Sequence, residues 1–178
     1  MQSSERIIGN SIHVLRQAVE LLGRLTDDQY ATAGPGRYAS SVGAHIRHIL
    51  DHYFRFLDGL SGGRIDYDSR TRDPRIEDDR AFAIAQFNGT IVRLQSFVGV
   101  DARHALETRV EVGDVAAGDV EWVASTVGRE IDFLLSHAIH HYGMIAIMLR
   151  MEGFDPGSEF GVAPSTLRYV QGRVLCAP

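Results

Sequence analysis

Four segments of the chain carry apolar residues at alternating intervals of three and four, which is the repeat of one face of an α-helix. Such stripes predict four amphipathic helices, each burying one face, and therefore an all-α four-helix bundle. The apolar positions are Ile8, Ile12, Leu15, Val19 and Leu22; Val42, Ile46, Ile49, Tyr53, Phe56 and Leu60; Ile84, Phe87, Ile91, Leu94 and Val98; and Val127, Ile131, Leu134, Ala138, Ile145 and Met148.

Residues that favour helix ends flank these stripes. Hydroxyl side chains can cap a helix start, and glycine often follows a helix end. The candidate caps are Ser3 or Ser4, Ser40 or Ser41, and Ser125 or Thr126, and the candidate ends are Gly62 with Gly63, and Gly153.

The segments between the stripes differ in character. Residues 61–78 are polar and rich in Gly, Pro, Arg and Asp, so we expect a long connection across an end of the bundle. Residues 106–112 and 120–124 alternate apolar with polar side chains, which predicts a small β-hairpin between the third and fourth helices. We expect residues 1–155 to form the bundle and residues 156–178 a C-terminal tail packed on it, with a short helical turn after Ser165.

Composition excludes several classes of function. The net charge is −5, Lys is absent and the Arg residues are scattered, so no basic surface for nucleic acid is expected. No apolar run reaches the roughly 18 residues of a membrane span, and the N-terminus lacks the pattern of a signal peptide. The one cysteine, Cys176, allows no intrachain disulfide and no cysteine zinc site, which fits the reducing cytoplasm.

Histidines carry the main chemical signal. Of the eight, six fall in two short helical windows, namely His45, His48 and His52, and His137, His140 and His141. His137 and His141 are one helical turn apart, and His141 continues the apolar stripe of the fourth helix, so both imidazoles can point to one place inside the bundle. A third imidazole can come from the second helix, where spacing does not choose among the three. His13 and His104 are expected at the surface, and His140 faces elsewhere.

Buried imidazoles are unfavourable unless their nitrogens are satisfied, and a divalent cation satisfies them. Three imidazoles leave positions open for water or substrate, as in catalytic metal sites. Imidazole ligands suit Zn, Ni, Fe and Cu, and we expect Zn or Ni first, with Fe next. The alternative is that the histidines hydrogen-bond to one another and have a structural role.

Two sequence motifs resemble the DinB/YfiT-like superfamily of metal-binding four-helix-bundle proteins. Residues 38–49, YASSVGAHIRHI, resemble the entry of its second helix, with Tyr38 nearest to its usual aromatic residue, and residues 136–143, SHAIHHYG, resemble its fourth-helix motif. The resemblance implies a metal held by His48, His137 and His141. It leaves His45 and His52 as neighbours of the site. His52 is also the alternative ligand, either in exchange for one of the three or as a fourth.

The resemblance also implies a function. Members include S-transferases that use low-molecular-weight bacterial thiols, so we expect a metal-dependent enzyme acting on a small molecule, and a homodimer. The alternative is a non-catalytic metal-binding protein, such as a stress protein or sensor. Glu130 and Asp51 are candidates to orient a ligand imidazole, although a solvated charge on a helix is the simpler interpretation for each. Arg47 and Arg129 are interpreted as members of surface ion pairs.

Overall fold

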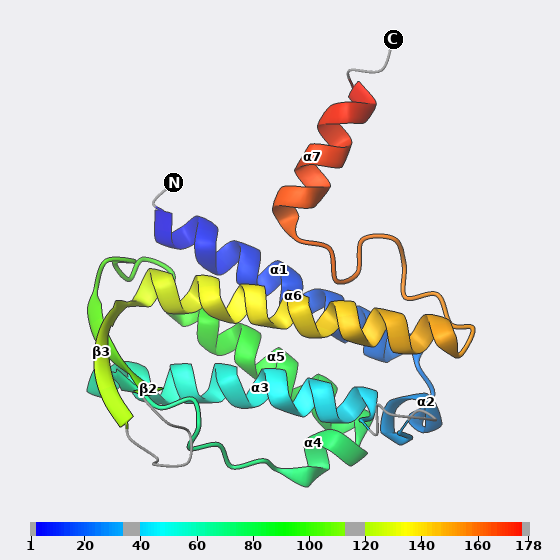
Figure 1. Ribbon diagram of the computed structural model, residues 1–178, viewed down its shortest axis with the longest axis horizontal. Coiled ribbons are helices and arrows are strands. Elements are labelled where there is room, and N and C mark those ends of the chain that lie inside the picture. The colour runs from blue at the N-terminus through cyan, green and yellow to red at the C-terminus, as the bar shows by residue number, and fades with distance from the viewer. Residues whose placement is uncertain (1–2, 34–39, 113–119, 176–178) are drawn as a thin grey trace.

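The computed structural model describes residues 3–33, 40–112 and 120–175, and within them it is mostly helical (Figure 1). Seven α-helices lie in this part of the chain: α1 (Ser3–Arg24), α2 (Asp27–Ala31), α3 (Val42–Gly59), α4 (Pro74–Asp78), α5 (Arg80–Ser96), α6 (Val127–Met151) and α7 (Pro164–Leu175). A 3-10 turn (Leu60–Gly62) follows α3. None of the described helices is long and apolar enough to cross a membrane.

The four predicted stripes lie on the four long helices. Helix α1 packs against α5 and α6, and α3 packs against the same two helices. Two of the candidate caps are confirmed, because Ser41 Oγ accepts from the amide of Ala44 and the Thr126 side chain accepts from the amide of Arg129. One stripe position is wrong: α5 ends at Ser96, and Val98 lies beyond it with half of its surface exposed.

A small sheet makes the fold mixed rather than all-α. Strands β2 (Ala105–Glu111) and β3 (Val120–Thr126) pair antiparallel, with Thr108 opposite Val123, which confirms the predicted hairpin. The unexpected element is β1 (Arg64–Ile65), which pairs in parallel with β2. The sheet lies at one end of the long helices (Figure 1).

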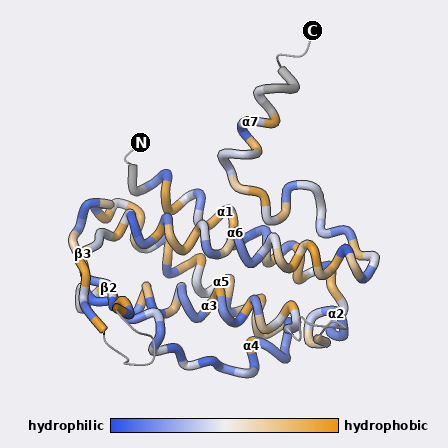
Figure 2. The backbone as a smooth tube through the Cα atoms, viewed as in Figure 1, coloured by the Kyte–Doolittle hydropathy of each residue, from blue (hydrophilic) through white to orange (hydrophobic). Residues whose placement is uncertain are grey.

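The connection between α3 and α5 takes a different course from the one expected. It does not simply cross an end of the helices, because after the 3-10 turn it forms β1, runs back beside α3 and forms α4 near the first turn of α3 (Figure 1). The approach of α4 is close: a Cβ on Gly43 would stand 2.0 Å from the backbone oxygen of Glu77. Figure 2 shows that much of this connection is hydrophilic. Its course brings polar side chains to the middle of α3.

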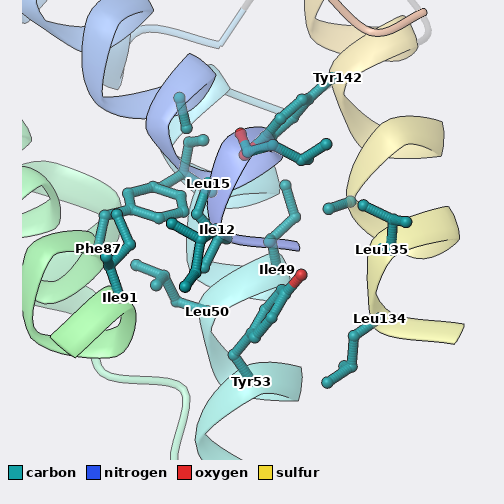
Figure 3. Packing of buried hydrophobic residues seen from close by; sticks show 14 of the residues in the cluster. Ile12, Leu15, Ile49, Leu50, Tyr53, Phe87, Ile91, Leu134, Leu135 and Tyr142 are labelled. Atoms are coloured by element: carbon teal, nitrogen blue, oxygen red, sulfur yellow. The ribbon is translucent and has the colours of Figure 1, made fainter. Parts of the chain in front are cut away.

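The core fills the space between the four long helices. Figure 3 shows buried side chains from all four meeting there, including Leu15, Ile49, Phe87 and Leu134. Two buried tyrosines satisfy their hydroxyls across helices. Tyr53 Oη lies 2.8 Å from Ser11 Oγ, and Tyr142 Oη donates to the Val14 carbonyl at 3.2 Å. The core role inferred for Tyr53 from its stripe position is therefore confirmed.

The segment after α6 contacts the helices before it leaves them. The ring of Phe160 stacks on Tyr142 with centroids 4.7 Å apart, and Gly161 (φ 74°) lies so close to Gly143 that a Cβ would stand 2.7 Å from the Gly143 nitrogen. Helix α7, where only a short turn was expected, then projects away from the other helices (Figure 1). The domain boundary after residue 155 stays a prediction, and Tyr38 and Cys176 lie outside the described residues.

Candidate metal centre

Helices α3 and α6 lie side by side and bring five histidines together. His48 is central, with its ring centroid 4.5 Å from that of His52, 4.9 Å from His137 and 4.7 Å from His141. His52 and His137 are 4.3 Å apart by the same measure, and His45 is 5.2 Å from His141. Residues three or four apart on each helix supply these rings, so the cluster follows directly from the helical repeat. We call these five residues the histidine cluster.

The three histidines that the resemblance implies as ligands are all in this cluster. Their ring centroids are 4.6–4.9 Å apart in every pair. Of the other histidines, His13 and His104 are exposed, as expected for surface residues, and His140 is exposed with its ring 5.3 Å from that of His141. The assignment of His48, His137 and His141 as the metal ligands remains a prediction.

A different set of three also fits a metal. One ligand atom from each of His48, His52 and His137 can be chosen so that all lie within 4.8 Å of one another. His52 follows His48 by one turn on α3, the same spacing that drew attention to His137 and His141. That spacing was the sequence signal by which His52 could be found as a candidate ligand, and it left His52 open as an alternative to His141.

The hydrogen bonds within the cluster leave lone pairs for a cation. Nδ1 of His52 donates to the His48 carbonyl at 2.8 Å, so its Nε2 carries no proton when the ring is neutral. Nδ1 of His45 and Nδ1 of His141 lie 3.0 Å apart, so one donates to the other. Nε2 of His137 is buried and has no hydrogen-bond partner among the described residues. A buried nitrogen without a partner is unfavourable, and a cation shared with His48 would satisfy it, so the residues fit a metal.

Burial keeps the imidazoles in the form that binds metal. Desolvation, reinforced by the neighbouring histidines, lowers the pKa of His48 to about 3, that of His137 to about 4 and that of His141 to about 3. Desolvation also lowers the pKa of His45 and of His52. The rings are therefore neutral at pH 7, and neutral imidazole is the form that coordinates a metal ion.

A positively charged side chain reaches the cluster from outside α3 and α6. Arg70, from the connection between β1 and α4, places Nη1 3.3 Å from Nδ1 of His48 and 3.3 Å from Nε2 of His52. Its charge helps to lower the pKa of both rings and of His137. Sequence reasoning missed Arg70, because nothing in its spacing relates it to the histidines and its position depends on the course of the connection.

Glu130 is neither a solvated charge nor a direct partner of an imidazole. Its carboxylate is buried, with 6% of the residue exposed, and it accepts from Tyr67 Oη at 2.9 Å and from Ser125 Oγ. The Tyr67 ring in turn stacks on His52, with centroids 5.5 Å apart and an interplanar angle of 22°. Glu130 therefore acts on the cluster through Tyr67.

Asp51 is also buried rather than solvated, and it does not bond to an imidazole. Its Oδ2 has no hydrogen-bond partner in the described part of the chain, although Arg47 Nη1 lies 3.8 Å away. Burial raises the pKa of Asp51, and the charges of Arg47 and Arg70 oppose that shift. Arg47 also pairs with Glu77 at 2.8 Å, and Arg129 lies over the Phe133 ring.

An apolar hollow adjoins the cluster at His45. It has a volume of about 270 Å³, and the exposed part of its wall is mostly carbon. Its lining residues are Ser40, His45, Met144, Ile147, Met148 and Met151. The hollow has room for a small apolar group beside the imidazole that contacts His141.

Comparison with known proteins agrees with these features. The family model of the DinB superfamily matches residues 13–145, a span that holds the whole histidine cluster. The chain is also 30% identical over 110 residues to the protein named FK506-binding protein 5 of Rhizopus delemar, a match that covers 60% of this chain and only 28% of the fungal protein. Since the family match extends over well over half of its residues, the chain belongs to the DinB superfamily.

Proposed function

We propose that the protein binds one divalent metal ion in the histidine cluster and uses it to act on a small molecule. The observation that carries the proposal is the buried Nε2 of His137, which has no hydrogen-bond partner in the described part of the chain and lies beside the ring of His48. His48 and His137 belong to both candidate ligand sets. For the third ligand we propose His141, on the family resemblance, with His52 as the competing assignment. Zn or Ni is the proposed ion, and Fe is the next candidate.

The proposed reaction is transfer of a low-molecular-weight thiol to an electrophile. When bound, a divalent ion lowers the pKa of a ligand thiol or water and so makes it a nucleophile at neutral pH. The thiol sulfur bonds to the electrophilic carbon, the bond from that carbon to its leaving group breaks, and a base takes the thiol proton. His45 lines the apolar hollow, and its Nδ1 would accept from Nδ1 of His141 when Nε2 of His141 holds the metal, so water is the proposed base. The hollow would hold the apolar part of the electrophile.

The second candidate is a non-catalytic metal-binding protein, a stress protein or sensor. It is favoured by the crowding of the cluster, where His48, His52, His137 and His141 lie within a few ångströms of one another. Four imidazoles would complete a tetrahedral sphere, as in structural sites, and leave no position for a substrate.

Metal analysis and a transfer assay test the proposal together. Protein purified without a histidine tag should hold one equivalent of metal, and His137→Gln should hold almost none, whereas exposed His13→Gln should match the wild type. The metal-loaded protein is then incubated with a panel of low-molecular-weight thiols and monochlorobimane. Metal without transfer activity would favour the sensor, and absence of metal would refute both candidates. Light scattering on the same samples tests the homodimer, which also stays a proposal.

A further inference from the structure

The side chain of Arg70 is unusual among the arginines around α3. Other arginines near α3 have oxygen partners: Arg47 pairs with Glu77, Arg109 pairs with Asp66, and Arg55 donates to the Asp66 carbonyl. Arg70 is half-buried and forms no ion pair with a carboxylate of the described residues. Its guanidinium contacts two imidazoles instead, each at 3.3 Å. A half-buried positive charge without an anion is an unfavourable arrangement for stability alone.

The contacts fix the direction of the hydrogen bonds. A guanidinium has donors and no acceptor, so Nδ1 of His48 and Nε2 of His52 must be the acceptors. Both lone pairs therefore point toward the place where Arg70 Nη1 lies. A metal ion bonded to either nitrogen would use the same lone pair and would repel the guanidinium. The cation and Arg70 consequently compete for these nitrogens.

A displaced Arg70 remains next to the metal and still needs a negative partner. Asp51 interacts electrostatically with Arg70, but it already lies 3.8 Å from Arg47 and bonds with the backbone of Arg72. Asp68, whose charge acts on His52, already lies 3.3 Å from Arg109. The remaining source of negative charge is the molecule that occupies the open side of the metal. Guanidinium binds carboxylate and phosphate oxygens in a two-pronged geometry, which makes it well suited to that role.

We propose that Arg70 binds an oxyanion, a carboxylate or a phosphate, on the small molecule that the metal centre takes. The proposal rests on the metal site of the proposed function and adds the chemical class of the ligand. It makes Arg70 a specificity-determining residue that changes partners, from the imidazoles of His48 and His52 to the anion, when a cation takes the nitrogens.

The first test measures metal affinity with Zn²⁺ alone, by competition with a chromophoric chelator. Arg70→Ala should bind Zn²⁺ about tenfold more tightly than the wild type, because a charged hydrogen bond that competes for the lone pairs is removed. Arg70→Lys keeps the charge and should stay close to the wild type. Arg75→Ala is the matched control, because it removes the same charge from the ion pair with Asp73 on neighbouring α4.

The second test measures anion binding to protein loaded with Co²⁺, whose visible absorption reports on its ligands. Acetate and inorganic phosphate distinguish the two sources of the oxyanion, and acetamide is the neutral control. In the wild type one of the two anions should saturate the change in absorption. Arg70→Ala should raise the dissociation constant of that anion about tenfold or more, as expected for loss of a charge-assisted hydrogen bond. Arg75→Ala should leave it unchanged.

The outcomes separate this inference from the proposed function. If the wild type takes up no metal, the proposed function fails first. If it binds Zn²⁺ and Arg70→Ala binds Zn²⁺ and the anion as the wild type does, only the role of Arg70 is refuted. Anion binding that is equally strong in Arg70→Ala would mean direct coordination to the metal and would also refute it. An equal response to acetamide would show that negative charge is not recognised.

Discussion

Nδ1 of His52 lies 2.8 Å from the carbonyl oxygen of His48, one helical turn earlier on α3. A carbonyl oxygen can only accept, so the proton of the neutral His52 ring is on Nδ1 and its Nε2 lone pair faces the cluster. The same kind of bond orients metal-binding histidines in many proteins. His52 is therefore prepared as a ligand even though the family resemblance points to His141.

Substitution of single histidines separates the two ligand sets. His48→Gln and His137→Gln should each abolish stoichiometric metal binding, because both sets contain these residues. We expect His141→Gln to do the same and His52→Gln to weaken binding by about 10- to 100-fold, the usual effect of losing a group that supports the ligands. Metal content after dialysis, together with competition against a chelator, ranks the variants by their loss of metal affinity. The reverse ranking of His52 and His141 would assign His52 as the third ligand, and exposed His13→Gln is the control.

Tyr67→Phe should destabilise the protein by about 1–3 kcal/mol, since it removes a donor from a buried carboxylate. Glu130 would keep only Ser125 of its two partners. Urea denaturation gives the free energy of unfolding. Ser136→Ala removes a hydroxyl from an exposed position of α6, and should alter the free energy by less than about 0.5 kcal/mol. Equal effects of the two substitutions would mean that the bond to Glu130 contributes nothing.

The long helices were predictable because their signal is local. A repeat of 3.6 residues appears within each segment, and Ser41 and Thr126 were among the expected caps and do cap α3 and α6. The hairpin was predictable for a similar reason, since alternation along β2 and β3 is a property of each strand. The histidine cluster followed from helical spacing, and its position inside the protein from His141 on the apolar stripe.

Other features depend on contacts between distant segments. Strand β1 has two residues, too few to show alternation, and exists because it pairs with β2. The contact of Arg70 with His48 depends on the path that the connection takes back along α3. Which three histidines could hold a metal was also not predictable from the sequence, because five rings lie close together and each offers two nitrogens.

The histidine pKa values predict how stability depends on pH in protein treated with a chelator. The pKa of His48 falls to about 3 and that of His137 to about 4 in the folded state, both from an ordinary value of 6.5. Below pH 6.5 the unfolded chain therefore binds more protons than the folded one, and the free energy of unfolding decreases as the pH falls toward 4. Above pH 6.5 these histidines are neutral in both states, so they do not make the free energy of unfolding depend on pH. Urea denaturation at pH 7.5, 6 and 5 measures the slope.

His48→Gln isolates this contribution from that of the carboxylates. The variant should lose less stability than the wild type between pH 6.5 and pH 5, because one group that resists protonation is gone. His13→Gln, at an exposed position, should follow the wild-type curve. Parallel curves for His48→Gln and the wild type would show that the cluster does not resist protonation.

Two glycines in helices predict opposite effects of the same substitution. Gly43 lies in the first turn of α3, where a Cβ would stand 2.0 Å from the backbone oxygen of Glu77 in α4. Backbone atoms cannot move aside as a flexible side chain can, so Gly43→Ala should separate α4 from α3 and cost about 1–3 kcal/mol. Gly89 lies in α5 with no atom within 4 Å of such a Cβ. Gly89→Ala should stabilise the protein by up to about 1 kcal/mol, because alanine favours helix.

Urea denaturation of both variants shows whether each substitution lowers or raises the free energy of unfolding. The close approach at Gly43 also holds the end of the connection that carries Arg70, so Gly43→Ala should loosen the contact of Arg70 with His48 and His52. Zn²⁺ affinity should then rise toward that of Arg70→Ala, whereas Gly89→Ala should leave it at the wild-type value. A stable Gly43→Ala protein with unchanged Zn²⁺ affinity would show that α4 neither packs tightly on α3 nor holds Arg70 at the cluster.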